Sequence, residues 1–112
     1  MSDAPVDVAK WSETVTADNA AATVTQAADS RLEHYVTSIH ASFSVANVQL
    51  LTLKDGSTIV GNWHVNDQRD IVFAKPLRIT HGAAVELSLA ASGTPGQIGA
   101  VTMTGLSIGF SA

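Results

Sequence analysis

The stretch "HYVTSIHASFSV", from His34 to Val45, decides the fold class because it alternates along its whole length. Its odd-numbered positions are mostly apolar and its even-numbered positions mostly polar. A period of two residues is typical of a strand with one buried and one solvent-facing side. We therefore predict a strand over residues 33–45, with His34 and His40 both on its polar face.

The spacing of these two histidines argues against a metal site. They are six residues apart, which corresponds to about 20 Å along a straight strand at roughly 3.3 Å per residue. Two imidazoles that share a zinc ion must each lie about 2 Å from it. We predict that His34 and His40 are solvated or lie at an interface, and that the protein uses no metal and no other cofactor.

Turn-forming residues divide the rest of the chain into short segments. Asp55 and Gly56 give a strong hairpin signal because both tolerate positive φ, and further turns are predicted at residues 66–69 and 93–96. A helix over residues 17–28 is the competing prediction near the start of the chain. The predicted strands include residues 20–26, 33–45, 48–54, 57–65, 70–74, 84–92 and 97–110.

About eight short strands, with turns every 8–12 residues and no helical period, predict an all-β fold, an antiparallel β-sandwich. Long strands near both ends and an apolar last strand favour a jelly roll. Residues 1–20 are mixed and polar. We therefore predict an extended N-terminal arm over residues 1–20 and a β-sandwich domain over residues 21–112.

Three strands carry more specific predictions. Residues 48–54 form a nearly continuous apolar run, which indicates burial on both faces. Pro76 is expected to end the strand at residues 70–74. In the last strand the apolar positions change parity at Gly105, which indicates either a bulge or a strand covered on both faces.

The amino-acid composition and charge limit the kinds of partner that the protein could bind. Charged residues make up only 14% of the chain, against about 25% in ordinary soluble domains. A thin core of Val, Ile, Leu and Ala with few surface charges predicts a homo-oligomer. The net charge of −4 without a basic cluster argues against nucleic acid, and no apolar run approaches the ~20 residues of a membrane span.

The sequence offers no coherent catalytic set. The run "GLSIG" (105–109) matches the pattern of a nucleophile elbow around Ser107, but that motif needs a following helix and later acid and histidine residues. The run "NDQRD" (66–70) fits a polar turn better than a calcium loop. No cysteine is present, which excludes thiolate chemistry and disulfides. We therefore predict that the protein is not an enzyme and has no catalytic residues.

Large apolar residues in unusual contexts are the candidates for partner binding. Trp11 lies in the polar leader, where docking onto the domain or onto a neighbour explains a tryptophan best. Trp63 shares strand parity with core residues, so packing in the core is its first expectation. The last strand is apolar on both parities, which adds two candidates. The partner-binding candidates are Trp11, Trp63, Met103 and Phe110.

The body of the chain resembles small virion proteins of tailed bacteriophages, which act as head decoration or minor structural proteins. The likeness lies in a histidine-led strand, the "LTLKDG" hairpin, an "F-x-x-P-L" segment, the run "AVELSLAASG" and a closing "VTMTG" strand. It covers residues 23–110, and the leader at residues 1–22 takes no part in it.

This resemblance implies a β-sandwich trimer that binds the major capsid protein lattice from outside. It also implies a location in the virion, after assembly in the host cytoplasm, and no signal peptide is expected at the N-terminus. The alternative is a carbohydrate-binding or adhesion module of a phage tail or baseplate, because jelly rolls serve that role too.

Overall fold

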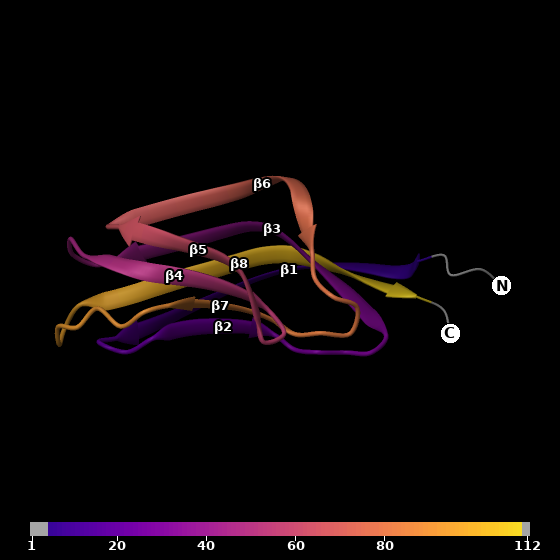
Figure 1. Cartoon of the computed structure of the whole chain (residues 1–112), viewed down its shortest axis with the longest axis horizontal. Helices are drawn as coiled ribbons and strands as arrows, with labels where there is room; N and C mark the ends of the chain where they lie inside the picture. Colours follow the sequence, from indigo (N-terminus) through magenta and orange to yellow (C-terminus); the bar gives the residue numbers. More distant parts are fainter. Residues whose placement is uncertain (1–4, 111–112) are drawn as a thin grey trace.

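A computed structural model describes residues 5–110, and this part of the chain contains eight strands and no helix (Figure 1). No helix that could cross a membrane is therefore found among these residues. The strands are β1 (Pro5–Asp18), β2 (Ala22–Gln26), β3 (Leu32–Phe43), β4 (Val48–Asp55), β5 (Thr58–Asn66), β6 (Gln68–Arg78), β7 (Val85–Leu89) and β8 (Ile98–Phe110).

The strands form two antiparallel sheets packed face to face. Sheet I has the order β1-β8-β3-β6 and sheet II the order β2-β7-β4-β5. The pairing is nested: the first strand pairs with the last, the second with the seventh, the third with the sixth and the fourth with the fifth. One long hairpin rolled up in this way gives the two Greek keys of a jelly roll. The predicted β-sandwich of jelly-roll type is confirmed.

The core lies between the sheets and consists of small aliphatic side chains, as the composition predicts. Its largest fully buried side chains are Leu51, Leu53, Ile79, Leu87, Leu89 and Met103. Burial of each such side chain contributes about 1.5–3 kcal/mol. The molecule is elongated, with extents of 55 × 24 × 21 Å, so the core is long and thin.

The predicted arm is wrong for the part of the leader that the structure describes. Residues 5–18 form β1, the edge strand of sheet I, which pairs with β8 along its length (Figure 1). Trp11, Val15 and Ala17 pack against the core, while Ser12 and Thr14 face solvent and bond to threonines of β8. An edge strand with hydroxyls on its outer face resembles a polar leader in sequence. Residues 1–4 lie outside the described residues.

A β-bulge in β3 corrects the predicted side for His34. The register of β3 against both neighbours shifts between Val36 and Ser38. The extra residue, Thr37, exchanges the two faces, so that His34 and Val36 point inward before it and Ile39 points inward after it. His34 is therefore buried, whereas His40 remains on the outer face as predicted.

Two other strand predictions also need correction. β4 is buried on one face only, because Leu51 and Leu53 point into the core while Val48 and Leu50 are exposed. β6 does not end before Pro76 but continues to Arg78. Residues 73–76 of β6 lie opposite the bulge of β3 and make no ladder pair, and β6 is an edge strand, so the missing N–H of proline costs nothing there.

The helix considered for residues 17–28 is absent, since these residues span the end of β1 and all of β2.

Gly105, at the parity change of β8, lies where the neighbouring strands β1 and β3 come unusually close, and not at a bulge in β8 itself. Odd-numbered residues of β8 point inward from Gly99 to Gly109 without interruption, and the irregularity lies opposite, in β3. A Cβ at Gly105 would lie 2.1 Å from the carbonyl oxygen of Tyr35 and 2.6 Å from the indole of Trp11. Only glycine lets β1, β8 and β3 meet at this point.

We predict that Gly105→Ala destabilises the protein by about 3 kcal/mol, because backbone cannot move aside for the new methyl group. Gly99→Ala is the matched control in the same strand, where the Cβ would lie 3.2 Å from the flexible ends of Leu89 and Phe43. We expect the control to lose less than about 1 kcal/mol. Urea unfolding midpoints measure both, and equal losses would contradict the close approach.

Candidate functional site

The predicted partner-binding side chains that the structure describes do not come together on one surface. Met103 is completely buried in the core, so its assignment to partner binding is wrong. Trp63 is half-buried, packs against the core and lies over Gly61, where a Cβ would come within 2.2 Å of its ring. The expectation of core packing for Trp63 is confirmed. The side chain of Phe110 lies outside the described residues.

Trp11 begins a chain of hydrogen bonds that crosses the sandwich. Its indole N–H donates to the hydroxyl of Ser107 at 2.9 Å, and that hydroxyl lies 2.6 Å from Nδ1 of His34. Nε2 of His34 lies 2.8 Å from the carbonyl oxygen of Ala27. Because a carbonyl only accepts, Nε2 carries the hydrogen, and in the neutral ring Nδ1 accepts from Ser107. The imidazole and indole rings also lie nearly perpendicular, at 88°, with ring centroids 6.3 Å apart.

This serine–histidine contact has the composition of a nucleophile and its base but not their arrangement. Ser107 is 4% exposed and His34 is 2% exposed, so no substrate reaches the hydroxyl. The second nitrogen of the imidazole faces a carbonyl group instead of the carboxylate that orients a catalytic base. These hydrogen bonds join β1, β8, β3 and the segment after β2. Sequence reasoning missed it because its members are far apart in the chain.

The outer face of sheet I carries many polar side chains that bond to one another, beside exposed apolar residues such as Val8 and Val72. His40 contacts the carboxylate of Asp70 on β6, and this hydrogen bond lowers the pKa of Asp70, with a smaller effect from Gln68. The polar turn predicted nearby is present: Asp67 has φ of 67° and accepts the backbone N–H of Asn47. Among residues 5–110, no group of three or more His, Cys, Asp or Glu side chains could hold a metal ion.

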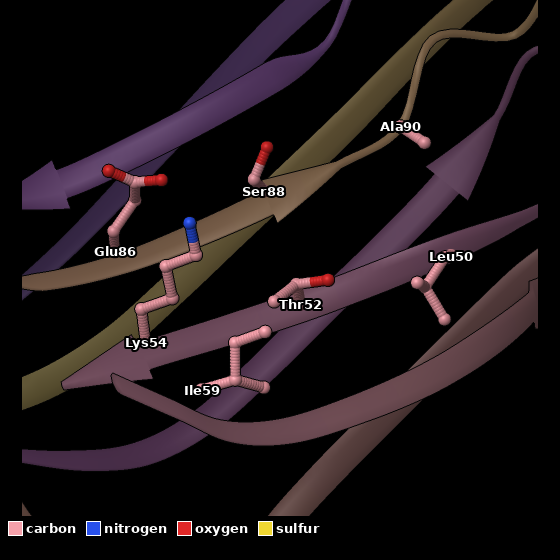
Figure 2. A pocket seen from close by; sticks show the side chains of 7 residues that line it. All are labelled: Leu50, Thr52, Lys54, Ile59, Glu86, Ser88 and Ala90. Carbon is pink, nitrogen blue, oxygen red and sulfur yellow. The ribbon is translucent and has the colours of Figure 1, made fainter. Parts of the chain in front are cut away.

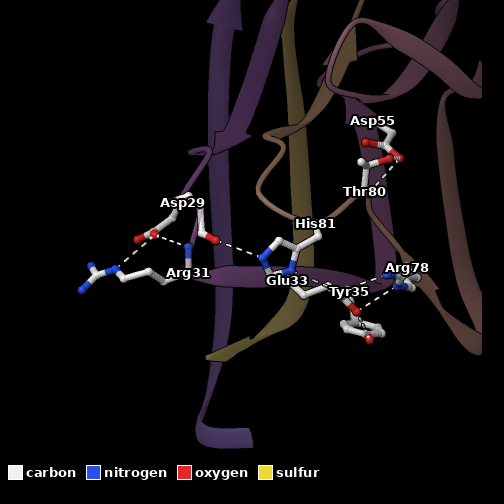
Figure 3. Close-up of polar contacts among 9 residues, drawn as sticks. Asp29, Arg31, Glu33, Tyr35, Asp55, Arg78, Thr80 and His81 are labelled. Carbon is white, nitrogen blue, oxygen red and sulfur yellow. Dashed lines mark hydrogen bonds and ion pairs between the residues drawn. The ribbon is translucent and has the colours of Figure 1, made fainter. Parts of the chain in front are cut away.

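A compact ionic cluster lies at one end of sheet I (Figure 3). Glu33 accepts two hydrogen bonds from Arg78, at 2.8 Å and 3.1 Å, and one from the hydroxyl of Tyr35. His81 lies 3.3 Å from the same carboxylate and 2.9 Å from the carbonyl oxygen of Ser30. The hydrogen bonds from Arg78, and then that from Tyr35, lower the pKa of Glu33 to about 2. The cluster fastens the ends of β3 and β6 to the two loops beside them.

A shallow hollow lies on the outer face of sheet II (Figure 2). Its volume is about 290 Å³, and it lies over β4, β5 and β7. One end carries the ammonium group of Lys54 and the carboxylate of Glu86, and the other end is apolar. The lining residues are Leu50, Thr52, Lys54, Ile59, Glu86, Ser88 and Ala90. The lining contains no aromatic ring and no nucleophile paired with a base, so the hollow is suited to contact rather than to chemistry.

Comparison with known proteins shows a likeness in fold and identifies no family. No protein-family model and no curated protein matches the sequence. A subunit of the Bacillus endospore appendages, described as a novel family of disulfide-linked pili, matches with a TM-score of 0.54 over 99% of this chain and 96% of that chain. Its sequence identity is 14%, so the likeness concerns the fold alone.

Two further solved structures show weaker likenesses. The CBM36-1 domain of a xylanase from the hindgut metagenome of Trinervitermes trinervoides has 17% identity and a TM-score of 0.39, over 88% of this chain and 77% of that chain. The coat protein of Tobacco streak virus has 11% identity and a TM-score of 0.35, over 97% and 89%.

We predict that Glu33→Gln destabilises the protein near pH 7 and that the difference disappears in acid. The pKa of Glu33 is lowered from 4.5 to about 2, so the stabilisation is fully present above about pH 4.5 and is lost as the pH falls through about 2. Arg78 is largely exposed, so we expect about 1–2 kcal/mol, less than the whole shift implies.

Urea unfolding at several pH values measures this effect. Glu13→Gln is the control, because Glu13 is an exposed carboxylate of sheet I that makes no ion pair with another described residue. A loss of stability for Glu33→Gln that persists unchanged at pH 2 would contradict the assignment, since it would then reflect packing rather than charge.

Proposed function

We propose that this protein is a non-enzymatic structural subunit that binds other protein subunits, in the specific form of a decoration protein on the outside of a bacteriophage capsid. The observation that carries the proposal is the outer face of sheet II. Val48, Leu50 and Ile59 are 55%, 40% and 53% exposed there, beside the shallow hollow. Exposed apolar side chains gathered on one face are typical of a protein–protein contact.

The use of the ionisable groups supports a structural role. Glu33 is occupied by Arg78, and His40 contacts Asp70. Asp55 accepts both the backbone N–H and the hydroxyl of Thr80. Each of these contacts fastens neighbouring strands or loops, and none directs a reactive group toward an open cavity.

The shared fold supports an assembly of subunits. The Bacillus appendage chain has the same fold and builds a pilus, as its description states. This chain has no cysteine, so its own assembly would depend on non-covalent contacts. The resemblance of residues 23–110 to phage virion proteins favours a capsid as the place of assembly, and binding would come from the faces of the sandwich, because residues 5–18 belong to the sheet and are not a free anchor.

The adhesion alternative has less support. A sugar-binding face usually presents an aromatic ring on which a sugar stacks. The hollow of sheet II has none, and Trp11 and Trp63 are both packed against the core.

The proposal predicts that the purified chain associates with itself or with phage heads prepared without it. Light scattering at micromolar to tens of micromolar concentration measures the first, and co-sedimentation with heads measures the second. Leu50→Ser combined with Ile59→Ser should weaken association at least tenfold, whereas Val72→Ser, at a residue of sheet I that is 78% exposed, should leave it unchanged. A chain that stays monomeric and binds no heads would overturn the proposed function.

A further inference from the structure

The middle of sheet II has a self-complementary pattern. Because the strand order is β2-β7-β4-β5, the centre of the sheet lies between β7 and β4. Three rows of outward side chains cross this centre. Lys54 lies opposite Glu86, Thr52 lies opposite Ser88, and Leu50 lies beside Ala90, whose N–H donates to the Leu50 carbonyl at 3.0 Å. The rows are therefore charged, hydroxyl-bearing and apolar in turn.

The charged row, Lys54 and Glu86, has no partner within the part of the chain that the structure describes. Residues directly opposite on antiparallel strands have Cβ atoms about 4.5–5.5 Å apart, close enough for an ion pair. Lys54 and Glu86 nonetheless make no ion pair or side-chain hydrogen bond, with each other or with any other described residue. Figure 2 shows the two side chains at the same end of the hollow. Both are half-buried, so each has lost part of its hydration without gaining a partner.

From this pattern we infer that a second copy of the chain covers the outer face of sheet II, in a two-fold dimer whose axis runs along the strands between β4 and β7. This inference rests on the proposed function as a structural subunit. A two-fold axis in that position places β4 of one copy over β7 of the other. Lys54 then meets Glu86 of the second copy, and Glu86 meets Lys54 of the second copy, in two equivalent ion pairs.

The same rotation matches the other two rows. Leu50 meets Ala90 of the second copy, which buries the apolar end of both hollows. Thr52 meets Ser88 of the second copy. These hydroxyls already bond within the chain, Thr52 to Asn62 and Ser88 to Thr23, both at 2.9 Å, so burial leaves neither without a partner. At the edges of the sheet, Ile59 on β5 comes over β2 of the second copy.

The size of the face predicts a weak dimer. The four strands are five to nine residues long. At about 4.8 Å between strands and about 3.4 Å per residue, they cover on the order of 450 Å². Two copies would bury about 900 Å², the size of a weak or transient interface. We therefore expect a dissociation constant in the micromolar range. The trimer implied by the resemblance to virion proteins would need a different interface.

Charge reversal tests the inference in the intact chain. Lys54→Glu and Glu86→Lys each bring like charges together twice across the two-fold axis, and we expect each to weaken the dimer at least tenfold in sedimentation equilibrium. The double variant K54E/E86K restores opposite charges at both contacts and should return to within about threefold of the original. Lys10→Glu, at an exposed position on the outer face of sheet I, is the control and should have no effect.

Mixing the two single variants separates an effect on dimerisation from an effect on folding, because a folding defect would not be repaired by the mixture. In the mixed dimer every charged contact again joins opposite charges. We expect the mixture to dimerise at least tenfold more tightly than either variant alone. Urea unfolding of each variant checks that the like charges introduced within one chain have not unfolded it.

Each outcome has a distinct meaning. If the single variants dimerise like the original, or if neither the double variant nor the mixture recovers, the two-fold contact on sheet II is overturned. If the original forms trimers or binds phage heads while the charge changes have no effect, the dimer fails and the proposed function stands. If the original neither self-associates nor binds heads, both fail.

Discussion

The close approach of three strands at Gly105 is the constraint on which the rest of the structure depends. With no side chain at Gly105, the indole of Trp11 lies directly on β8 and the carbonyl of Tyr35 comes against the same position. The indole N–H then reaches Ser107, which reaches His34, and His34 reaches the carbonyl of Ala27 after β2. One tryptophan on an edge strand therefore ties sheet I to the start of the connection from sheet II. Each buried polar group in this chain of hydrogen bonds has a hydrogen-bond partner, so the free-energy penalty for burying these groups is small.

The bulge in β3 lies next to this close approach, because Val36 pairs with Gly105, and it decides which side chains reach the outer surface. By exchanging the faces at Thr37, it sends His34 inward to Ser107 and leaves Glu33 and Tyr35 pointing outward. Opposite the bulge, β6 carries four unpaired residues and then returns to pair with β3, which brings Arg78 to Glu33. The ionic cluster is thus a consequence of backbone geometry.

The fold could be predicted from the sequence to a large extent, because the hairpin at Asp55–Gly56 and the alternating strands are local signals. The face that each residue occupies was harder to predict. Thr37 has nothing in its type that marks a bulge, so the alternation of 34–45 placed His34 on the wrong side. The apolar run of β4 indicated burial on both faces, since the sequence alone does not distinguish an apolar residue in the core from an apolar residue on the surface. Glu33 and Arg78 are joined only by the pairing of β3 with β6, which no local pattern reveals.

The two outer faces differ in how much they would gain from a partner. On sheet I, Ser12 bonds to Thr104, Thr14 bonds to Thr102, and His40 contacts Asp70. Covering these polar groups would exchange one set of satisfied contacts for another, so the gain on sheet I would come mainly from its exposed apolar side chains, among them Val8 and Val72. On sheet II the two central charges, Lys54 and Glu86, have no partner among the described residues, and the flanking apolar side chains are exposed. Burial of this face would add a hydrophobic contribution and two ion pairs. Because Lys54 and Glu86 are already half-buried in the single chain, the further desolvation penalty, which usually cancels the gain from a buried ion pair, is smaller. The unsatisfied centre of sheet II is therefore the feature of the surface that a structural subunit would use first.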